Sequence, residues 1–409
     1  MKTITPPQPK TPAHVPPHLV WDHSLGAFCR ELDDPFVAAS RLHEGPDIFW
    51  ATDSGHMRPG WIITRHDLLR EAFVDYAHFT SQGGSGIEHL LNVNWRLVPI
   101  DYDPPQHSLY RQVLNPFFTP AKVAELDEAV QKVCQSLIAT FAARGSCEFV
   151  SEFATPFPTY IFLALMGMPV ERAPQFLAWE REITHGDSFD VRAAAARAIC
   201  EYLTGFLEAQ RANPTTDLMA GILAARIDGR PLSDNEILGM LHTFYFGGLD
   251  TVYSTLGFIL RRLATDPALQ ARLRDNPEVL PKAVDEFLRA YSVVSSRRCV
   301  TEDFVFHGVQ MKKGDLVVLP LYLAGRDPKV HAAPHDIDLD RETGGGQPFA
   351  VGPHHCLGRH LAKREIRIAL QSLLSRFRGI HIPAGETYAY HSGVTFGVDR
   401  LPLAWEPNA

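Results

Sequence analysis

Residues 348–358 read Pro-Phe-Ala-Val-Gly-Pro-His-His-Cys-Leu-Gly, and the stretch 361–377 that follows has the periodicity of a helix. Cys356 therefore stands in an irregular loop at a helix N-terminus, where unpaired backbone N–H groups and the positive end of the helix dipole meet. Both features favour a thiolate, so we expect a lowered pKa for this cysteine. A thiolate can bind a metal or act as a nucleophile, although most unpaired cysteines are buried and inert.

Two glycines near this cysteine favour a metal-bound cofactor. Gly352 and Gly358 leave room for a close, flat neighbour such as a porphyrin. A thiolate ligand pushes electron density onto a haem iron and so favours cleavage of the O–O bond. A hydrolase with Cys356 as nucleophile and His354 or His355 as base is the alternative. Neighbouring residues at a helix start seldom reach that geometry, and the colour of the pure protein would separate the two hypotheses.

The bulk composition is that of a globular protein large enough to enclose a cofactor. The chain has 409 residues, of which 45% are hydrophobic and 21% charged. Its net charge of -8 gives no general reason to bind nucleic acid. The six cysteines are scattered without a CxxC pair, which argues against a disulfide framework and a structural zinc site. We expect a cytoplasmic protein.

Hydrophobic periodicity predicts a mainly α-helical domain with a small β portion. We expect an extended segment over 1–18, which is rich in proline and trails over the surface, and a single domain over 19–409. The first 18 residues lack the apolar core of a secretory signal, and no apolar run of about 18 residues predicts a membrane helix. Helical patterns cover 122–144, 191–212, 233–264 and 281–291; β patterns cover 47–50, 61–64, 304–309 and 316–319.

An unusual sequence interrupts the apolar helical pattern over 233–264. Gly247 and Gly248 precede Asp250 and Thr251. Each glycine inside a helix costs about 1 kcal/mol relative to alanine, which indicates a bulge or the close approach of a ligand. A carboxylate beside a hydroxyl can deliver protons to bound oxygen without flooding the site with water. The alternative is a kinked core helix whose threonine hydroxyl bonds back to a carbonyl.

Two charged pairs have the spacing of one helix face. Glu286 and Arg289 are three residues apart and could form a solvated ion pair. His107 and Arg111 are four residues apart and follow Asp103-Pro-Pro, which starts a helix well. Their common face suits two carboxylates of a ligand.

With these motifs in this order, the sequence resembles the cytochrome P450 family over about residues 20–405, and most closely its bacterial camphor-hydroxylase group. Phe349, Gly352, Cys356 and Gly358 match the loop that carries the iron ligand. Ala350 stands where the family usually has glycine, and His355 directly precedes the cysteine. We expect both departures to alter the hydrogen bonding around the sulfur.

The resemblance implies the cytochrome P450 fold, a triangular helical prism that holds haem b between the long I and L helices. It implies that Cys356 ligates the iron, that Asp250 and Thr251 deliver protons, and that Glu286 and Arg289 support the haem loop structurally. It also implies a set of cofactor-binding residues, of which the first four bind the propionates: His107, Arg111, Arg298, His354, Gly247, Gly248, Phe349 and Gly358.

Matching of motifs also implies a substrate pocket, lined by Trp95, Leu97, Ile100, Thr184, Phe244, Phe246, Val294, Val394 and Thr395. Trp95 lies close to the position of a tyrosine that donates a hydrogen bond to the ketone in the camphor enzyme. Tryptophan can donate through its N–H but differs in shape. We therefore expect a compact apolar substrate, a terpenoid or norisoprenoid, rather than camphor.

The resemblance implies a monomer that uses O₂ and receives electrons from a [2Fe–2S] ferredoxin and its NADH-dependent reductase. A basic face formed by Arg70, Arg111, Lys363 and Arg364 would steer such an acidic donor. A peroxide-driven peroxygenase is an alternative, but those relatives usually have Arg-Pro in place of Asp250 and Thr251. A haem sensor is another alternative, and it would have no need of Thr251.

Overall fold

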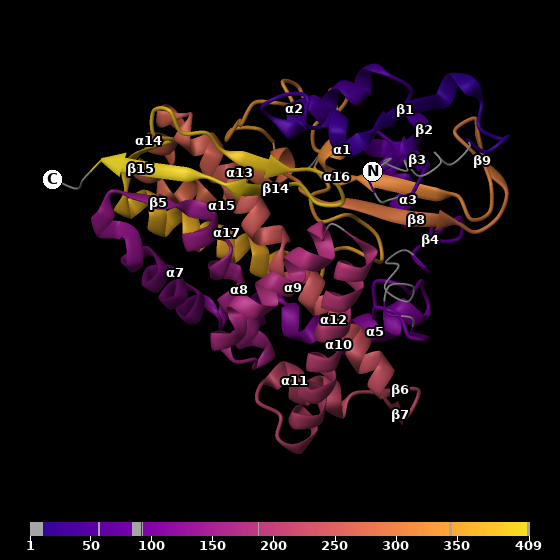
Figure 1. The fold of residues 1–409 in the computed structure, drawn as a ribbon, viewed down its shortest axis with the longest axis horizontal. Helices are drawn as coiled ribbons and strands as arrows, with labels where there is room; N and C mark the ends of the chain where they lie inside the picture. Colours follow the sequence, from indigo (N-terminus) through magenta and orange to yellow (C-terminus); the bar gives the residue numbers. More distant parts are fainter. Residues whose placement is uncertain are drawn as a thin grey trace, which may run out of the picture.

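Two consecutive helices run through the middle of the molecule, α12 (Asp234–Leu249) and α13 (Thr251–Ala264) (Figure 1). Ser233 begins the first with a capping box, because its hydroxyl accepts from the amide of Glu236 while Glu236 accepts from the amide of Ser233. The sequence predicted one helix over 233–264. The structure divides it at Asp250, beside the glycine pair.

The structure is a computed structural model that describes residues 11–55, 58–83, 91, 93–186, 188–342 and 346–406. Its outline in Figure 1 is triangular, wide at the top and narrowing toward α11 (Asp217–Ala224) at the bottom. Helices make up most of it, which confirms the predicted mainly α fold with a small β portion. In the part of the chain that is described, no helix is long and apolar enough to cross a membrane.

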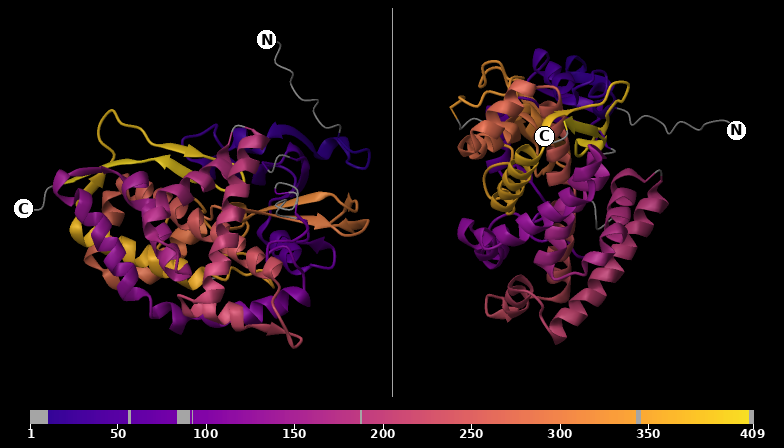
Figure 2. Two further views of the ribbon diagram at one scale, coloured as in Figure 1. Left: turned by 60° about the horizontal axis from the view of Figure 1, so that its bottom comes forward. Right: turned by 90° about the vertical axis from the view of Figure 1, so that its left-hand side faces the viewer.

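The helix that follows Cys356 is α17 (Arg359–Arg376), and it packs against α7 (Asp127–Phe141), α13 and α15 (Leu280–Ala290). The predicted helices over 281–291 and after Cys356 are thus confirmed. The predicted helix over 122–144 is instead three pieces, α6 (Pro120–Ala124), α7 and a 3₁₀ turn, Ala142–Arg144. The long helix α10 (Phe189–Ala212), pink in the right-hand view of Figure 2, runs along the outside of the molecule.

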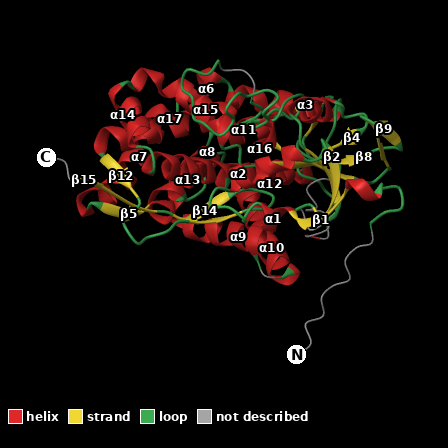
Figure 3. Ribbon diagram, turned by 90° about the horizontal axis from the view of Figure 1, so that it is seen from above, coloured by secondary structure: helices red, strands yellow, loops and turns green. Residues whose placement is uncertain are grey.

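The β portion is divided between two ends of the molecule (Figure 3): the main sheet lies at the right, and a small sheet of β5 (Ser146–Glu148), β12 (Arg378–His381) and β15 (Pro402–Glu406) lies at the left. Its main sheet has six strands in the order β1 (Val20–Ser24), β2 (Ile48–Asp53), β3 (Gly60–Ile63), β11 (Leu316–Pro320), β8 (Ser295–Val300) and β4 (Phe79–Thr80). The predicted strands over 47–50, 61–64 and 316–319 are confirmed. The β pattern over 304–309 belongs to a separate hairpin, β9 (Phe304–Phe306) with β10 (Val309–Met311).

Within the expected extended N-terminal segment, His14 and Val15 pack against the domain. Val15 is 5% exposed in the core, and His14 bonds to Asp315 at 2.8 Å. The imidazole also lies against Trp50 and Trp61, with ring centroids 6.1 and 6.3 Å away. Residues 1–10 lie outside the described part.

The buried side chains form two large clusters that meet around α12 and α13. The larger cluster lies between the main sheet and the helices α7, α13, α15 and α17. The second lies among α8 (Pro156–Met166), α9 (Ala173–His185), α10 and α12. The residues predicted for the active site come from the elements where these two clusters face each other.

Candidate active site

The loop before α17 is held by its own backbone. The amide of Cys356 donates to the carbonyl of Phe349 at 3.0 Å, and the amide of His355 donates to Gly352 at 3.1 Å. Burial raises the pKa of the Cys356 thiol, while amides of Gly358 and Arg359 and the charges of Arg111 and Arg359 oppose the rise. The expected lowering of this pKa is therefore wrong for the polypeptide alone, because desolvation outweighs the helix N-terminus.

The glycines of this loop have different tasks. Gly352 has φ +73°, and a Cβ there would lie 3.1 Å from the carbonyl oxygen of Phe73 on α3 (His66–Val74). It thus allows a left-handed turn packed on α3, and clearance for a porphyrin is not its role. A Cβ at Gly358 would meet no atom of the described chain within 4 Å. Ala350 also has a positive φ, +56°, which strains a residue with a side chain.

The four residues predicted to bind propionates lie together. The rings of His107 and His354 are 4.2 Å apart between centroids. Burial and the charge of Arg111 lower the pKa of His107 to about 4. Burial and the charges of Arg298, His107 and Arg111 lower the pKa of His354 to about 2, so both imidazoles are neutral near pH 7.

These four groups come from three parts of the chain, one of which is the Cys356 loop that carries His354. His107 and Arg111 lie on α5 (Gln106–Leu114), and Arg298 lies on β8. Arg111 Nη1 donates to the carbonyl of His355 at 2.8 Å, which ties α5 to the Cys356 loop. His354 Nε2 lies 3.0 Å from the hydroxyl of Ser81.

The four predicted propionate-binding residues fit haem b, because they include buried polar groups without a partner among the described residues. Both ring nitrogens of His107 are buried, and no described residue bonds to either. Arg298 is 7% exposed, and burial lowers its pKa to about 10. Buried donors and cations require acceptors, which two propionate carboxylates would provide. The Cys356 sulfur could serve as an iron ligand, and a Cβ at Gly247, as at Gly358, would meet no described atom within 4 Å.

Asp250 and Thr251 lie where α12 passes into α13. The Thr251 hydroxyl donates to the carbonyl of Gly247 at 3.2 Å, as in the predicted kinked helix. The Asp250 carboxylate is 8% exposed and accepts from the hydroxyl of Ser254 at 3.0 Å. The helix therefore presents a buried acid beside a hydroxyl, one turn after Gly247.

Gly248 faces a different neighbour from Gly247. A Cβ at Gly248 would lie 2.6 Å from Cδ2 of Phe162, on α8. Its lack of a side chain lets α8 approach α12, and the expectation that both glycines serve the cofactor is corrected for Gly248. Phe349 is half-buried in the loop, with its ring 6.0 Å from Nζ of Lys363.

The predicted pocket residues fall into separate groups. Trp95 and Leu97 are buried and pack with Phe246 of α12 and Cys200 of α10 in a small apolar cluster. Val294 forms a β-bridge with Thr395, which joins two more of the predicted residues.

The remaining predicted pocket residues are less enclosed. Ile100 and Val394 are 49% and 48% exposed. Phe244 packs against Phe118, with ring centroids 5.8 Å apart, in the second core cluster. The side chain of Thr184 lies outside the described part of the structure.

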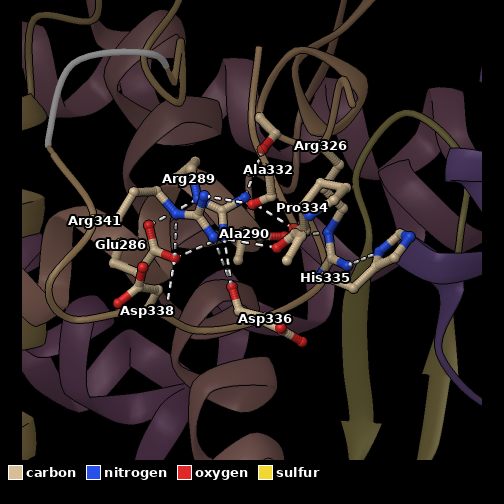
Figure 4. A network of polar contacts seen from close by, with 12 residues as sticks. Glu286, Arg289, Ala290, Arg326, Ala332, Pro334, His335, Asp336, Asp338 and Arg341 are labelled. Carbon is tan, nitrogen blue, oxygen red and sulfur yellow. Dashed lines mark hydrogen bonds and ion pairs between the residues drawn. The ribbon is translucent and has the colours of Figure 1, made fainter. Parts of the chain in front are cut away.

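Glu286 and Arg289 form a buried pair on α15 rather than a solvated one (Figure 4). Two guanidinium nitrogens bond to the two carboxylate oxygens at 2.7 Å, and each residue is 4% exposed. Arg289 also donates to the carbonyls of Gly325, Pro334 and Asp336. The pair thereby fixes the irregular segment that leads to the Cys356 loop.

Sequence reasoning missed three polar residues of the site, namely Ser254, Arg341 and His242. Ser254 follows Asp250 by four residues, a spacing that could have identified it. Arg341 donates to Glu286 at 3.1 Å from a segment without periodicity. His242 is 1% exposed on α12 with its ring 4.9 Å from that of Trp95, and a lone histidine within an apolar helix was the only signal.

Comparison with known proteins agrees with this geometry. Residues 184–390 match the family model of cytochrome P450. The chain is 35% identical over 401 residues to the probable cytochrome P450 127A1 of Sinorhizobium fredii, with 96% of each chain covered. It is 29% identical to vitamin D(3) 25-hydroxylase of Pseudonocardia autotrophica, covering 86% of this chain and 89% of that protein.

Solved structures extend the match to the whole fold. Cytochrome P450 CYP101C1 superposes with a TM-score of 0.87 at 32% identity, over 97% of this chain and 100% of the other. The family match includes α12, α15 and the Cys356 loop, which carry the motifs of the candidate site. The chain therefore belongs to the cytochrome P450 family and is a monooxygenase that binds haem b.

Proposed function

We propose that this monooxygenase hydroxylates a small apolar substrate, a terpenoid or norisoprenoid. The observation that carries the proposal is the apolar cluster of Trp95, Leu97 and Phe246, in which Phe246 directly precedes Gly247 on α12. Aromatic and aliphatic walls bind a compact hydrocarbon skeleton through the hydrophobic effect and through shape. Phe246 and Trp95 are large, so they would restrict the size of the ligand.

The cofactor would be held from three elements. The haem, when bound, supplies an iron that activates O₂. In our proposal Cys356 provides the thiolate ligand, and His107, Arg111, Arg298 and His354 bind the propionates. Burial of Arg298 strengthens such a contact, because charge-assisted hydrogen bonds gain in a low dielectric.

Asp250 and Thr251 would deliver the protons that the reaction consumes. Asp250 is buried and bonded to Ser254, so its carboxylate is held in one place. Thr251 carries its hydroxyl on the Gly247 side of the helix, where it donates to the Gly247 carbonyl. An acid and a hydroxyl in an apolar wall can pass a proton while excluding bulk water.

Electrons would come from a [2Fe–2S] ferredoxin that is reduced by an NADH-dependent reductase. Burial lowers the pKa of His355, and the nearby charges of Arg359, Arg111 and Lys363 lower it further, so positive groups lie around the Cys356 loop. A positive patch on a protein of net charge -8 would steer an acidic donor to this face. Part of the expected basic face is neutralised, because Arg364 pairs with Asp127 at 2.7 Å and Lys363 with Asp285 at 2.6 Å.

The test is a spectrum followed by a product assay. The reduced carbon-monoxide complex should absorb at the wavelength that gives the family its name, and Cys356→His should abolish that band while keeping the pigment. Small terpenoids and norisoprenoids should then shift the ferric spectrum from low to high spin and give hydroxylated products with NADH, ferredoxin and reductase. A normal carbon-monoxide spectrum without any spin shift across such a panel would reject the proposed substrate class.

A further inference from the structure

His242 is a buried histidine beside the proposed pocket. It lies on α12 and is 1% exposed. Its ring centroid is 4.9 Å from that of Trp95 and 6.4 Å from that of Phe246. Both aromatic residues belong to the apolar cluster that contains Leu97, so the imidazole is a polar group beside an apolar wall.

The protonation of this imidazole is set by the helix. Nδ1 lies 2.8 Å from the carbonyl oxygen of Leu238, four residues earlier. A carbonyl oxygen can only accept, so Nδ1 carries the proton and donates. Burial lowers the pKa of His242 to about 4, which keeps the ring neutral at neutral pH. Nε2 is consequently a hydrogen-bond acceptor with a free lone pair.

Among the residues that the structure describes, no donor serves that lone pair. Nε2 is buried, and none of the residues that the structure describes bonds to it. Buried acceptors in native proteins are nearly always paired, with a protein group, an ordered water or a ligand. The imidazole that carries this nitrogen lies beside Trp95 and Phe246, the residues to which we assign the substrate.

We propose that Nε2 of His242 accepts a hydrogen bond from the substrate, which therefore carries a hydroxyl or N–H group on its apolar skeleton. This inference rests on the proposed function, because it assumes that the Trp95 and Phe246 wall holds the substrate. The substrate class becomes a compact alcohol or amine, and a ketone is disfavoured. A ketone oxygen has no proton and would place its lone pairs against that of Nε2.

The bond would also position the ligand. One directional contact in an apolar pocket restricts how a compact skeleton can rotate and so decides which carbon faces Gly247 and Thr251. His242 would thus act as a positioning residue for specificity, without touching the reacting atoms. The reaction that supplies such a substrate must itself leave an oxygen or nitrogen function on the skeleton, as a hydration or a first hydroxylation does.

Three ligands of one skeleton test the proposal: borneol, camphor and bornane, which carry a hydroxyl, a ketone and no polar group. Dissociation constants are measured by equilibrium dialysis with the haem-loaded enzyme, so the result does not depend on turnover. We expect borneol to bind about tenfold more tightly than camphor, a factor that corresponds to about 1.4 kcal/mol. Equal affinities for borneol and camphor would mean that water serves Nε2, and would overturn the inference.

Two variants separate the hydrogen bond from shape. His242→Phe keeps an aromatic ring without an acceptor and should lose the preference for borneol. His242→Gln places an amide oxygen near the position of Nε2 and should retain part of it. A preference that survives unchanged in His242→Phe would contradict the proposal.

A measurement on the unaltered chain covers the case in which neither variant folds. The ¹⁵N resonance of His242 Nε2, observed in the diamagnetic ferrous carbon-monoxide form, should move upfield with borneol and stay in place with camphor. A resonance that is indifferent to borneol would reject the role of His242. If none of the three ligands binds while the carbon-monoxide spectrum is normal, the proposed substrate class fails instead.

Discussion

The hydroxyl of Ser254 donates a 3.0 Å hydrogen bond to Oδ1 of Asp250, one helical turn earlier. Ser254 is fully buried. It lies beside Gly397, where an added Cβ would come within 2.9 Å of the Ser254 hydroxyl oxygen and 2.7 Å of Nε2 of His391. His391 in turn bonds through Nδ1 to Asp399 at 2.7 Å, and that carboxylate is 50% exposed. Ser254 and His391 therefore lie on the same side of Gly397, and the His391–Asp399 pair reaches the surface.

We predict from this arrangement that Ser254→Ala lowers turnover about tenfold, because the carboxylate loses a charge-assisted bond that holds it in place. Asp250→Asn should lower turnover further, by about 10²-fold, because the acid itself is removed. Both rates are measured with saturating substrate and ferredoxin, and product is counted per NADH. The dissociation constant of the substrate should stay unchanged. Turnover of Ser254→Ala equal to that of the unaltered enzyme would show that Ser254 does not position the acid.

The Glu286–Arg289 pair should contribute to stability through its burial. Arg289→Ala leaves the buried Glu286 carboxylate with Arg341 as its remaining cationic partner and removes the donor to three carbonyls, so we expect a loss of about 3 kcal/mol in the free energy of unfolding. Urea unfolding of the holoenzyme measures the loss. Arg272→Ala is the matched control, since its pair with Asp340 is exposed and should be worth at most about 1 kcal/mol. Similar losses in the two variants would contradict this assignment.

Much of the site could be predicted from sequence because its residues lie on periodic elements or in a dense local motif. The acid and hydroxyl of 250–251 and the pair on α15 follow from spacing along a helix. The convergence of His107 with His354 needed the family resemblance, because they are 247 positions apart in the chain. His242 could not be found, because its importance depends on an unpaired nitrogen, which is a property of tertiary contacts.

The errors have equally specific causes. Gly352 was interpreted as clearance, yet its backbone angle and its neighbour Phe73 explain it. The pKa of Cys356 was expected to fall because of the helix N-terminus, but desolvation is a tertiary effect that sequence does not display. The break at Asp250 was invisible because the apolar pattern continues on both sides of it.

Ala350 offers a stabilising substitution. A φ of +56° costs an L-residue about 1–2 kcal/mol of conformational energy. A glycine at this position avoids that cost but lowers the free energy of unfolding by about 0.4–1 kcal/mol, because it gives the unfolded chain more conformational freedom. Ala350→Gly should therefore raise the free energy of unfolding by about 0.5–1 kcal/mol, measured by urea unfolding. The reverse change nearby, Gly352→Ala, should lower it, because strain at φ +73° adds to a contact of 3.1 Å with the Phe73 carbonyl. A destabilised Ala350→Gly would show that the methyl group contributes packing that exceeds the strain.

Glu365 should make stability depend on pH. Its carboxyl is 3% exposed on α17, and burial raises its pKa to about 8 from 4.5. Between about pH 4.5 and pH 8 the folded protein keeps the Glu365 proton, whereas the unfolded chain has released it. The contribution of Glu365 to the free energy of unfolding is therefore complete below pH 4.5 and is lost as the pH rises through 8. Glu365→Gln, which is neutral at every pH, should remove this loss.

The expected difference grows with pH. Relative to pH 5, the unaltered holoenzyme should lose at most about 5 kcal/mol by pH 8.5 from this group, since each pKa unit corresponds to about 1.4 kcal/mol. Urea unfolding at several pH values should give a falling curve for the unaltered chain and a flatter one for Glu365→Gln. The exposed Glu278→Gln serves as control and should follow the unaltered chain. Parallel curves for Glu365→Gln and the unaltered chain would mean that Glu365 is already ionised in the folded state, held there by an interaction that offsets its burial.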